Sequence, residues 1–283
     1  MKLKNIILIT IIVTSLFSCN KPVQKLNLNI ASYNIRYDNE HDGLDAWKYR
    51  KEMVKSLIQF HDFDIFGTQE GLKNQLEDIA ELESYSYFGK GRDDGKDAGE
   101  HSAIFYKTDI FELLDSGDFW FSETPDKPSK GWDATCCNRI CTWGKFQHKE
   151  SCKIFFVFNS HFDHEGVEAR RNSSLLLLQK IEEIAKNKSV FCIGDFNAFP
   201  SDEPMKIMYE KDVLSDSYKT SKAKPYGTFA TFNDFKIEHN KEERIDYIWV
   251  SKDITVNKYG TLNEIQHGHF PSDHYPIMIN VSF

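Results

Sequence analysis

Clusters of acid, amide and imidazole side chains stand at the ends of apolar, strand-like segments along this chain. They are SYNIR at 32–36, FGTQE at 66–70, NSHFDH at 159–164, IGDFN at 193–197, RIDYIWVS at 244–251 and SDHYP at 272–276. A rigid sheet displays reactive groups where its strands emerge, so the pattern predicts a sheet-based fold with a shared site at the strand ends. Carboxylate and amide oxygens suit magnesium or manganese, and the cysteine and histidine spacing typical of zinc sites is not found.

The first eighteen residues have the pattern of a targeting segment. Lys2 and Lys4 precede an apolar stretch at 6–17 that is shorter than a membrane span, and Cys19 follows. The pattern resembles a bacterial lipoprotein signal at 1–18, which leaves a lipidated Cys19, a tether at 19–25 and a domain at 26–283. An uncleaved anchor and an ordinary secretory peptide are the alternatives. We therefore expect attachment to a membrane of the bacterial cell envelope, facing the periplasm or the cell surface.

Composition and charge limit the classes of protein to consider. No glycine-, serine- or proline-rich linker divides residues 26–283, and 22 Phe and 12 Tyr favour one large packed core. The net charge is −8, and loss of Lys2 and Lys4 with residues 1–18 makes it −10. This charge disfavours broad attraction to nucleic acid. We expect a monomer.

Five cysteines follow the predicted lipid-attachment position, and an odd number leaves at least one thiol unpaired or intermolecular. Cys152 and Cys192 border strand-like segments, which predicts buried apolar side chains. Cys136, Cys137 and Cys141 lie close together in the sequence. Ordinary packing is the preferred interpretation for these three, with a disulfide or a metal knot as the alternatives.

Periodicity predicts the order of the elements. Apolar residues alternate over 26–33, and they repeat at helical spacing over 47–61, 72–82 and 165–186. The segment between 102 and 160 is rich in strand-favouring aromatic and branched residues. Helices that alternate with strands around a β-rich middle predict an α/β fold with two packed sheets flanked by helices. The polar segment 89–100 is predicted to be a loop that lines substrate.

Asn34, Glu70 and Asp273 are the residues that we expect to hold a divalent cation. Hard cations take several oxygen ligands, and magnesium keeps part of its water shell so that phosphate oxygens can enter. Any one of these residues alone is better explained by a structural role. Asn34 suits a turn, Glu70 suits a helix start and Asp273 suits an N-cap.

Asp195 and Asn197 lie just beyond an apolar strand, where alternate side chains point to the same side. Asp195 is predicted to activate water, and Asn197 to hold a phosphate oxygen. An Asx-turn that closes the strand is the structural alternative for the same tripeptide.

Two histidines and an arginine complete the predicted site. Asp246 is expected to orient His274 and to favour its protonated form, which would stabilise charge on phosphate. His161 is expected to donate a hydrogen bond to the same oxyanion, and Asp163 to fix its orientation. Arg139 is predicted to be a bidentate phosphate clamp. A structural role for His274 and a surface ion pair for Arg139 are the alternatives.

The ordered motifs SYNIR, TQE, NSHFDH, GDFN, RIDYIWVS and SDH resemble the endonuclease/exonuclease/phosphatase family over about Leu26 to Phe283. This family includes pancreatic deoxyribonuclease, inositol polyphosphate 5-phosphatases, neutral sphingomyelinases and deadenylases. The resemblance implies a four-layer α/β sandwich with two packed, mainly antiparallel sheets and magnesium between their edges. It matches residues with the family's metal positions, its Asp-x-Asn pair and its closing carboxylates and histidine: Asn34, Glu70, Asp195, Asn197, Asp246, Asp273 and His274. SYNIRYDN, GWDA, NRICTW and HFDHEGVEARRNS are similar to a branch of exported bacterial members.

The resemblance and the site chemistry together predict a Mg²⁺-dependent hydrolase of ester bonds, with Mn²⁺ as the alternative cation. We expect a phosphoesterase that hydrolyses a phosphomonoester or small phosphodiester by in-line attack of water. His161 fits the branch with histidine beside phosphate, as in phosphatases and deadenylases, whereas apurinic endonucleases are expected to use tyrosine. A secreted or envelope nuclease acting on DNA or RNA is the first alternative. A catalytically inactive surface binding protein is the second, and a structural envelope lipoprotein ranks last.

Overall fold

The computed structural model describes residues 25–238 and 244–283, so the predicted signal at 1–18 and Cys19 lie outside the described residues. In spatial order, the first sheet contains β11 (Thr255–Thr261), β12 (Ile277–Ser282), β1 (Asn27–Asn34), β2 (Ile65–Gln69), β4 (Ile104–Lys107) and β3 (Tyr85–Phe88). The second contains β5 (Phe111–Trp120), β6 (Ile140–His148), β7 (Ile154–His161), β8 (Ser189–Asp195), β10 (Asp246–Val250) and β9 (Ser215–Asp216). The helices are the 3-10 helix η1 (Glu40–Asp45), α1 (Trp47–Phe60), α2 (Lys73–Ala80), α3 (Val167–Ala185), α4 (Glu203–Glu210) and α5 (Ser217–Thr220). Within the described ranges, no helix combines the length and apolarity needed to cross a bilayer.

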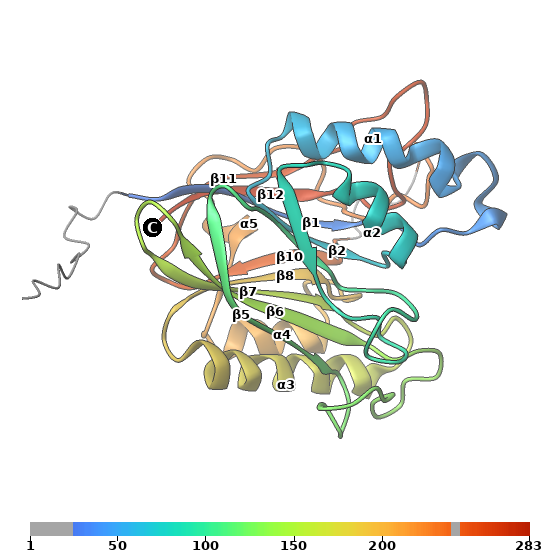
Figure 1. Ribbon diagram of the computed structural model, residues 1–283. Coiled ribbons are helices and arrows are strands. Elements are labelled where there is room, and N and C mark those ends of the chain that lie inside the picture. Colours follow the sequence, from blue (N-terminus) through green and yellow to red (C-terminus); the bar gives the residue numbers. More distant parts are fainter. Residues whose placement is uncertain (1–24, 239–243) are drawn as a thin grey trace, which may run out of the picture.

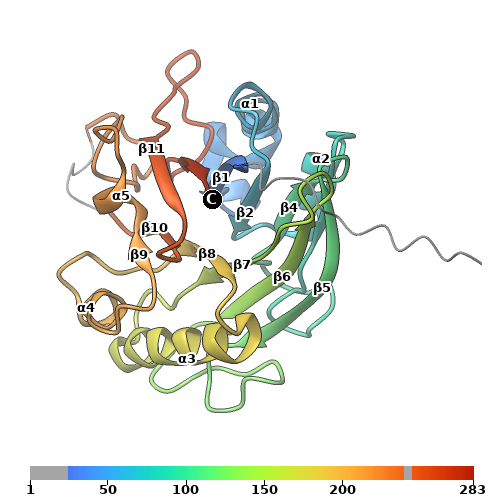
Figure 2. The same ribbon diagram turned by 90° about the vertical axis from the view of Figure 1, so that its left-hand side faces the viewer.

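The two sheets pack face to face, with helices on both outer surfaces. Figures 1 and 2 show α1 and α2 over the first sheet, and α3 and α4 against the second. Each sheet has one parallel pair, β1 with β2 and β7 with β8, and its other pairs are antiparallel. The predicted four-layer α/β sandwich with mainly antiparallel sheets is confirmed, as are the helices expected over 47–61, 72–82 and 165–186.

Alternation along the strands fills three separate core layers. In β1, Leu28 and Ile30 face the second sheet, whereas Ala31 and Tyr33 pack under α1 and α2. The strand β8 behaves in the same way, with alternate residues in the inter-sheet core and in the core beneath α3 and α4. Successive strand side chains point to opposite faces, so an apolar run buried on both faces belongs in the middle of such a sandwich.

A buried amide joins the two sheets close to one edge. Asn159 of β7 donates from Nδ2 to the carbonyl oxygens of Thr68 and Ala103, each at 2.9 Å. Its Oδ1 accepts a hydrogen bond from Gln69 Nε2 at 2.6 Å. Gly67 makes room for this contact, because a Cβ there would lie 2.5 Å from Asn159 Cγ. These bonds fix β2 against β7 just before both strands end.

Strand direction brings the polar motifs to the same edge. The parallel strands β1, β2, β7 and β8 end there, and their antiparallel neighbour β10 begins there. The register places Asp195 beside His161 on one side and beside Asp246 on the other. The loop before β12 carries Asp273 and His274 to the same edge. Local sequence patterns alone do not specify this convergence, because it depends on strand pairing.

Candidate active site

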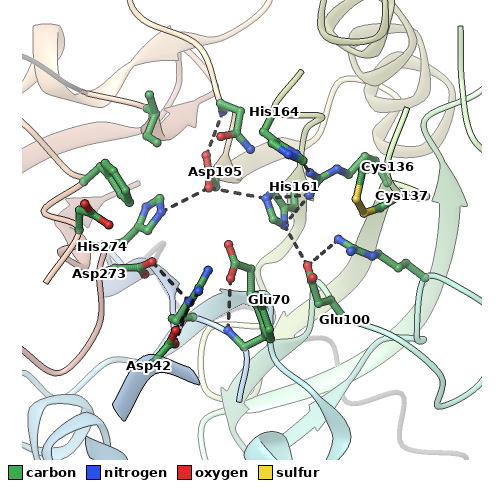
Figure 3. Close-up of a pocket in the computed structure, with 18 of the residues that line it drawn as sticks. Asp42, Glu70, Glu100, Cys136, Cys137, His161, His164, Asp195, Asp273 and His274 are labelled. Atoms are coloured by element: carbon green, nitrogen blue, oxygen red, sulfur yellow. Dashed lines mark hydrogen bonds and ion pairs between the residues drawn. A yellow bond between two sulfur atoms is a disulfide. The ribbon is translucent and has the colours of Figure 1, made fainter. Parts of the chain in front are cut away.

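A cavity of about 620 Å³ opens at this edge of the sandwich, and Figure 3 shows the side chains that converge on it. Seven of the predicted site residues line it: Glu70, Arg139, His161, Asp195, Asn197, Asp273 and His274. The other two, Asn34 and Asp246, are buried and hydrogen-bond to members of that set. All nine therefore belong to one constellation, although their chemical roles remain predictions.

Asn34 is the last residue of β1, and its side chain links the ends of β2 and β8. Its Nδ2 donates to Glu70 Oε1 and to Asp195 Oδ2, both at 3.0 Å, and its Oδ1 accepts the N–H of Arg36. Glu70 lies at φ 63°, in the left-handed region, where the chain turns out of β2. In this arrangement Asn34 orients the two carboxylates. Its assignment as a metal ligand remains a prediction.

Asp195 is buried at the centre of the site. Its Oδ1 accepts the N–H of Asn197 at 2.9 Å, so the Asx-turn considered as the structural alternative is present. Its Oδ2 lies 3.7 Å from His161 Nε2 and 3.8 Å from His274 Nε2. Burial and the nearby charge of Asp246 raise the pKa of Asp195 to about 7. The turn therefore holds one oxygen while the other faces both imidazoles.

His274 and Asp246 form the predicted pair. His274 Nδ1 lies 3.0 Å from Asp246 Oδ2, and both side chains are buried. Burial alone would lower the pKa of His274, but the charge of Asp246 and its hydrogen bond outweigh burial and raise the pKa to about 10. The imidazole is therefore cationic at neutral pH. The structure brings these two residues together, and their catalytic role stays a prediction.

His161 has a different environment. Burial and the adjacent guanidinium of Arg139 hold its pKa well below the usual range, so the ring is neutral. Arg139 Nη1 lies 3.0 Å from His161 Nε2. The expectation that Asp163 orients His161 is wrong, because the Asp163 carboxylate instead accepts from Arg139 Nε and from the N–H groups of Glu165 and Gly166. Asp163 therefore orients the arginine and the turn before α3.

Sequence patterns did not identify several charged residues of the site, and two of them come from one loop. The loop at 89–100 lines the cavity as expected, and it contributes Arg92 and Glu100. Glu100 Oε2 lies 3.8 Å from His161 Nδ1 and 2.5 Å from Arg92 Nη1. Burial and the charge of Glu70 raise the pKa of Glu100 to about 7. A loop lacks a repeating pattern, so nothing in the sequence distinguishes these residues from the other charges in the same segment.

The cysteines also differ in part from expectation. Cys136 and Cys137 form a disulfide that lines the cavity, so the preferred interpretation of ordinary packing is wrong for this pair. Cys141 and Cys192 are buried in the apolar core between the second sheet and its helices. Cys152 is only half-buried, which corrects the prediction that it is a core residue.

The chemistry of the cavity fits a divalent cation. Glu70 and Asp195 place carboxylate oxygens within 4.8 Å of each other, next to the His274 ring. Asp273 lies nearby with its Oδ2 3.8 Å from Arg36 Nε, and burial is the main cause that raises its pKa to about 6. Several carboxylates thus share a buried space, where their negative charges repel one another. A cation with oxygen ligands would neutralise them.

Comparison with known proteins places this site in a family. A model of the endonuclease/exonuclease/phosphatase family matches residues 31–274. A mannosyl-6-phosphatase structure from Bacteroides thetaiotaomicron VPI-5482 is 44% identical, with a TM-score of 0.86, over 90% of this chain and 100% of that chain. A second family protein from Bacteroides thetaiotaomicron is 43% identical, with a TM-score of 0.89, over 92% of this chain and 99% of that one.

A viral relative matches nearly as much of the chain. An uncharacterized protein of Acanthamoeba polyphaga mimivirus is 28% identical over 273 residues, which are 90% of this chain and 98% of that protein. The family match, the shared sandwich and the convergence of the polar motifs agree with one another. This chain belongs to the endonuclease/exonuclease/phosphatase family of hydrolases, which act on phosphoester bonds.

Proposed function

We propose that this protein is a Mg²⁺-dependent phosphomonoesterase that removes phosphate from a sugar phosphate. The observation that carries the proposal is the placement of Asp195 Oδ2 between two imidazoles of opposite protonation, 3.7 Å from His161 and 3.8 Å from His274. The Asp195 carboxylate then serves as the base, between the His274 imidazolium and the neutral His161 ring. The 44% identity to a mannosyl-6-phosphatase over that whole chain supports a sugar phosphate as the substrate class.

The residues divide the work of hydrolysis. Asp195 takes a proton from water, whose oxygen forms the new bond to phosphorus as the bond to the sugar oxygen breaks. The His274 imidazolium, held by Asp246 at 3.0 Å, offsets the charge that develops on phosphate. Asn197 donates from its side chain to the Phe162 carbonyl oxygen at 3.1 Å, and its proposed role is to hold a phosphate oxygen.

Glu70 and Asp273, with Asn34 between the strand ends, are the residues proposed to hold the cation. When bound, Mg²⁺ or Mn²⁺ would supply positive charge to polarise the phosphoryl group. Burial raises the pKa of Glu70, but the charge of His274 and the hydrogen bond from Asn34 outweigh it and lower that pKa overall. Glu70 is therefore ionised at neutral pH and ready to bind a cation.

The arginines of the cavity favour a small substrate over nucleic acid. Arg36 pairs with Asp42 at 3.0 Å, Arg92 with Glu100 at 2.5 Å, and Arg139 with Asp163 at 3.4 Å. A groove that follows a nucleic-acid backbone carries a net positive charge. Here each guanidinium already has a carboxylate partner, and the whole chain is acidic.

A substrate panel tests the proposal. We expect cation-dependent release of phosphate from mannose 6-phosphate, with kcat/KM at least about tenfold above that for inositol phosphates, phospholipids, RNA or plasmid DNA. Chelator and the Glu70→Ala variant should abolish the release, which would also exclude a pure binding protein. Faster cleavage of RNA or DNA than of any monoester would instead support a nuclease and contradict the proposal.

Attachment to the envelope membrane through a lipidated Cys19 is part of the same proposal. Intact protein expressed with its first 25 residues should partition into detergent, and the Cys19→Ala variant should remain in the aqueous phase. Equal partition of both proteins would contradict lipid attachment.

A further inference from the structure

The disulfide between Cys136 and Cys137 forms part of the cavity wall. Cys136 is exposed and Cys137 half-exposed, and both line the cavity with Glu100 and His161. Figure 3 shows the disulfide and Glu100 on the side of His161 away from His274. A disulfide has no S–H donor, and its two sulfur atoms present a polarizable, apolar surface. This wall therefore lies beyond the residues assigned to phosphate.

The loop that carries the disulfide is anchored on both sides. Before it, Asp133 accepts the N–H groups of Glu168 and Ala169 at 3.1 and 2.7 Å, at the start of α3. After it, Asn138 donates from Nδ2 to the Arg92 carbonyl oxygen at 3.1 Å. A binding surface that is held in place before the ligand arrives loses less entropy on binding. The two sulfur atoms are thus a fixed part of the cavity.

A polar pair completes this part of the cavity. Arg92 and Glu100 are buried or nearly so, and they contact each other at 2.5 Å. Their carboxylate and guanidinium groups provide hydrogen-bond acceptors and donors beside an apolar surface. A pyranose ring presents the same two features, because its hydroxyl groups lie around the ring edge and its C–H groups form apolar faces. Specific ligand sites commonly combine an apolar wall with a few placed polar groups.

We propose that the Cys136–Cys137 disulfide is the apolar platform of a subsite for the sugar ring of the substrate, with Arg92 and Glu100 binding its hydroxyl groups. The inference rests on the proposed sugar phosphatase activity and names the residues that select the alcohol portion of the ester. Arg139, two residues after Cys137, lies 3.0 Å from His161 Nε2, so the subsite adjoins the residues assigned to phosphate. A hexose 6-phosphate has its ring and its phosphate separated by one methylene group, which suits adjoining sites.

Two monoesters of primary alcohols test the subsite, mannose 6-phosphate with a ring and glycerol 3-phosphate without one. The ratio of kcat/KM for the first to that for the second should fall about tenfold in the C136S/C137S variant. The C136A/C137A variant should show the same fall, because it also removes the linked sulfur atoms. A phosphine reductant should lower the ratio of the wild-type protein and leave the ratio of both variants unchanged.

The ratio separates recognition from folding. A loss of fold lowers the concentration of active enzyme, so it reduces both activities in proportion and leaves the ratio unchanged. An unchanged ratio in both variants and in the reduced wild-type protein would overturn the subsite while the phosphatase assignment stands. Absence of release from both monoesters by wild-type protein with Mg²⁺ or Mn²⁺ would overturn the proposed function, and the subsite with it.

Discussion

At the scale of residues, carboxylates and imidazoles of the site have different pKa values because their surroundings differ. Asp195 and Asp273 have raised pKa values of about 7 and about 6, largely through burial, whereas Glu70 has a lowered pKa beside His274. His274 is cationic because of Asp246, and His161 is neutral because of burial and Arg139. An enzyme needs a base and a cation at the same pH, and such separated values provide them.

The pair of Asp246 and His274 gives the first prediction. Asp246→Asn removes the charge that keeps His274 protonated, so kcat/KM for the phosphoester should fall by about 10²-fold or more. The exposed Asp126→Asn variant, which also removes one carboxylate, is the control. Initial rates of phosphate release measure both. An Asp246→Asn rate equal to that of Asp126→Asn would show that the pair is only structural.

The sequence predicted much of the site because its residues follow recognisable strands. Asp195 and His161 each end an apolar run, and that placement needs no knowledge of the tertiary structure. Glu100 and the Cys136–Cys137 disulfide come from long loops, where no periodicity fixes the direction of a side chain. The prediction that Asp163 contacts His161 was wrong for a related reason. The Asp163 carboxylate accepts hydrogen bonds from the backbone N–H groups of its own turn, and only the folded structure shows this.

At the scale of elements, a buried ion pair attaches β9 and α5 to β10. Arg244 donates to both oxygens of Asp216, at 3.0 and 2.6 Å, and both side chains are almost completely buried. Asp216 also accepts the N–H of Tyr218 at the start of α5 and the hydroxyl of Tyr209 from α4. Four short elements thus depend on one carboxylate. The periodicity of the sequence gives no sign of this arrangement, because β9 and α5 are too short to show a pattern.

Arg244→Gln gives the second prediction. It leaves the Asp216 charge buried without its partner, so the free energy of unfolding should fall by about 3–5 kcal/mol. Lys252→Gln removes a cation from the exposed pair with Asp212, and it should cost about 0–1 kcal/mol. Urea denaturation of both variants tests the difference. Equal midpoints for the two variants would contradict the importance of the buried pair.

At the scale of the whole molecule, the sandwich concentrates acidic groups at one edge and stabilises them elsewhere. The inter-sheet core and the hydrogen bonds of Asn159 hold Glu70, Asp195 and Asp273 together, although their negative charges repel one another. The sequence predicted two sheets flanked by helices, but it did not predict the strand order. Pairing such as β1 with β12 joins residues about 250 positions apart in the chain, beyond the reach of any local pattern.

The crowded acids give a third prediction, on stability and pH. Asp195 and Asp273 have folded-state pKa values of about 7 and about 6, above the unfolded value of about 3.9, so the folded protein holds more protons between these values. The cation-free protein should therefore lose stability as pH rises from about 4 to about 7. Mg²⁺ binding beside these carboxylates is favoured once they have lost their protons, so the increase of Tm with Mg²⁺ should be larger at about pH 8 than at about pH 5.

Differential scanning calorimetry measures that increase. The Glu70→Gln variant removes one proposed oxygen ligand and serves as the control, because its increase with Mg²⁺ should be smaller at the higher pH. A larger increase at the lower pH would show that the cation does not bind these carboxylates.

The central claim is that these strand-end residues form one cation-dependent hydrolytic centre, and the turnover of purified Asp195→Ala with saturating Mg²⁺ tests it most directly. We predict that wild-type protein releases phosphate from its monoester substrate and that Asp195→Ala loses about 10³-fold or more in kcat while it unfolds at a similar temperature. Wild-type turnover retained by folded Asp195→Ala would contradict the account.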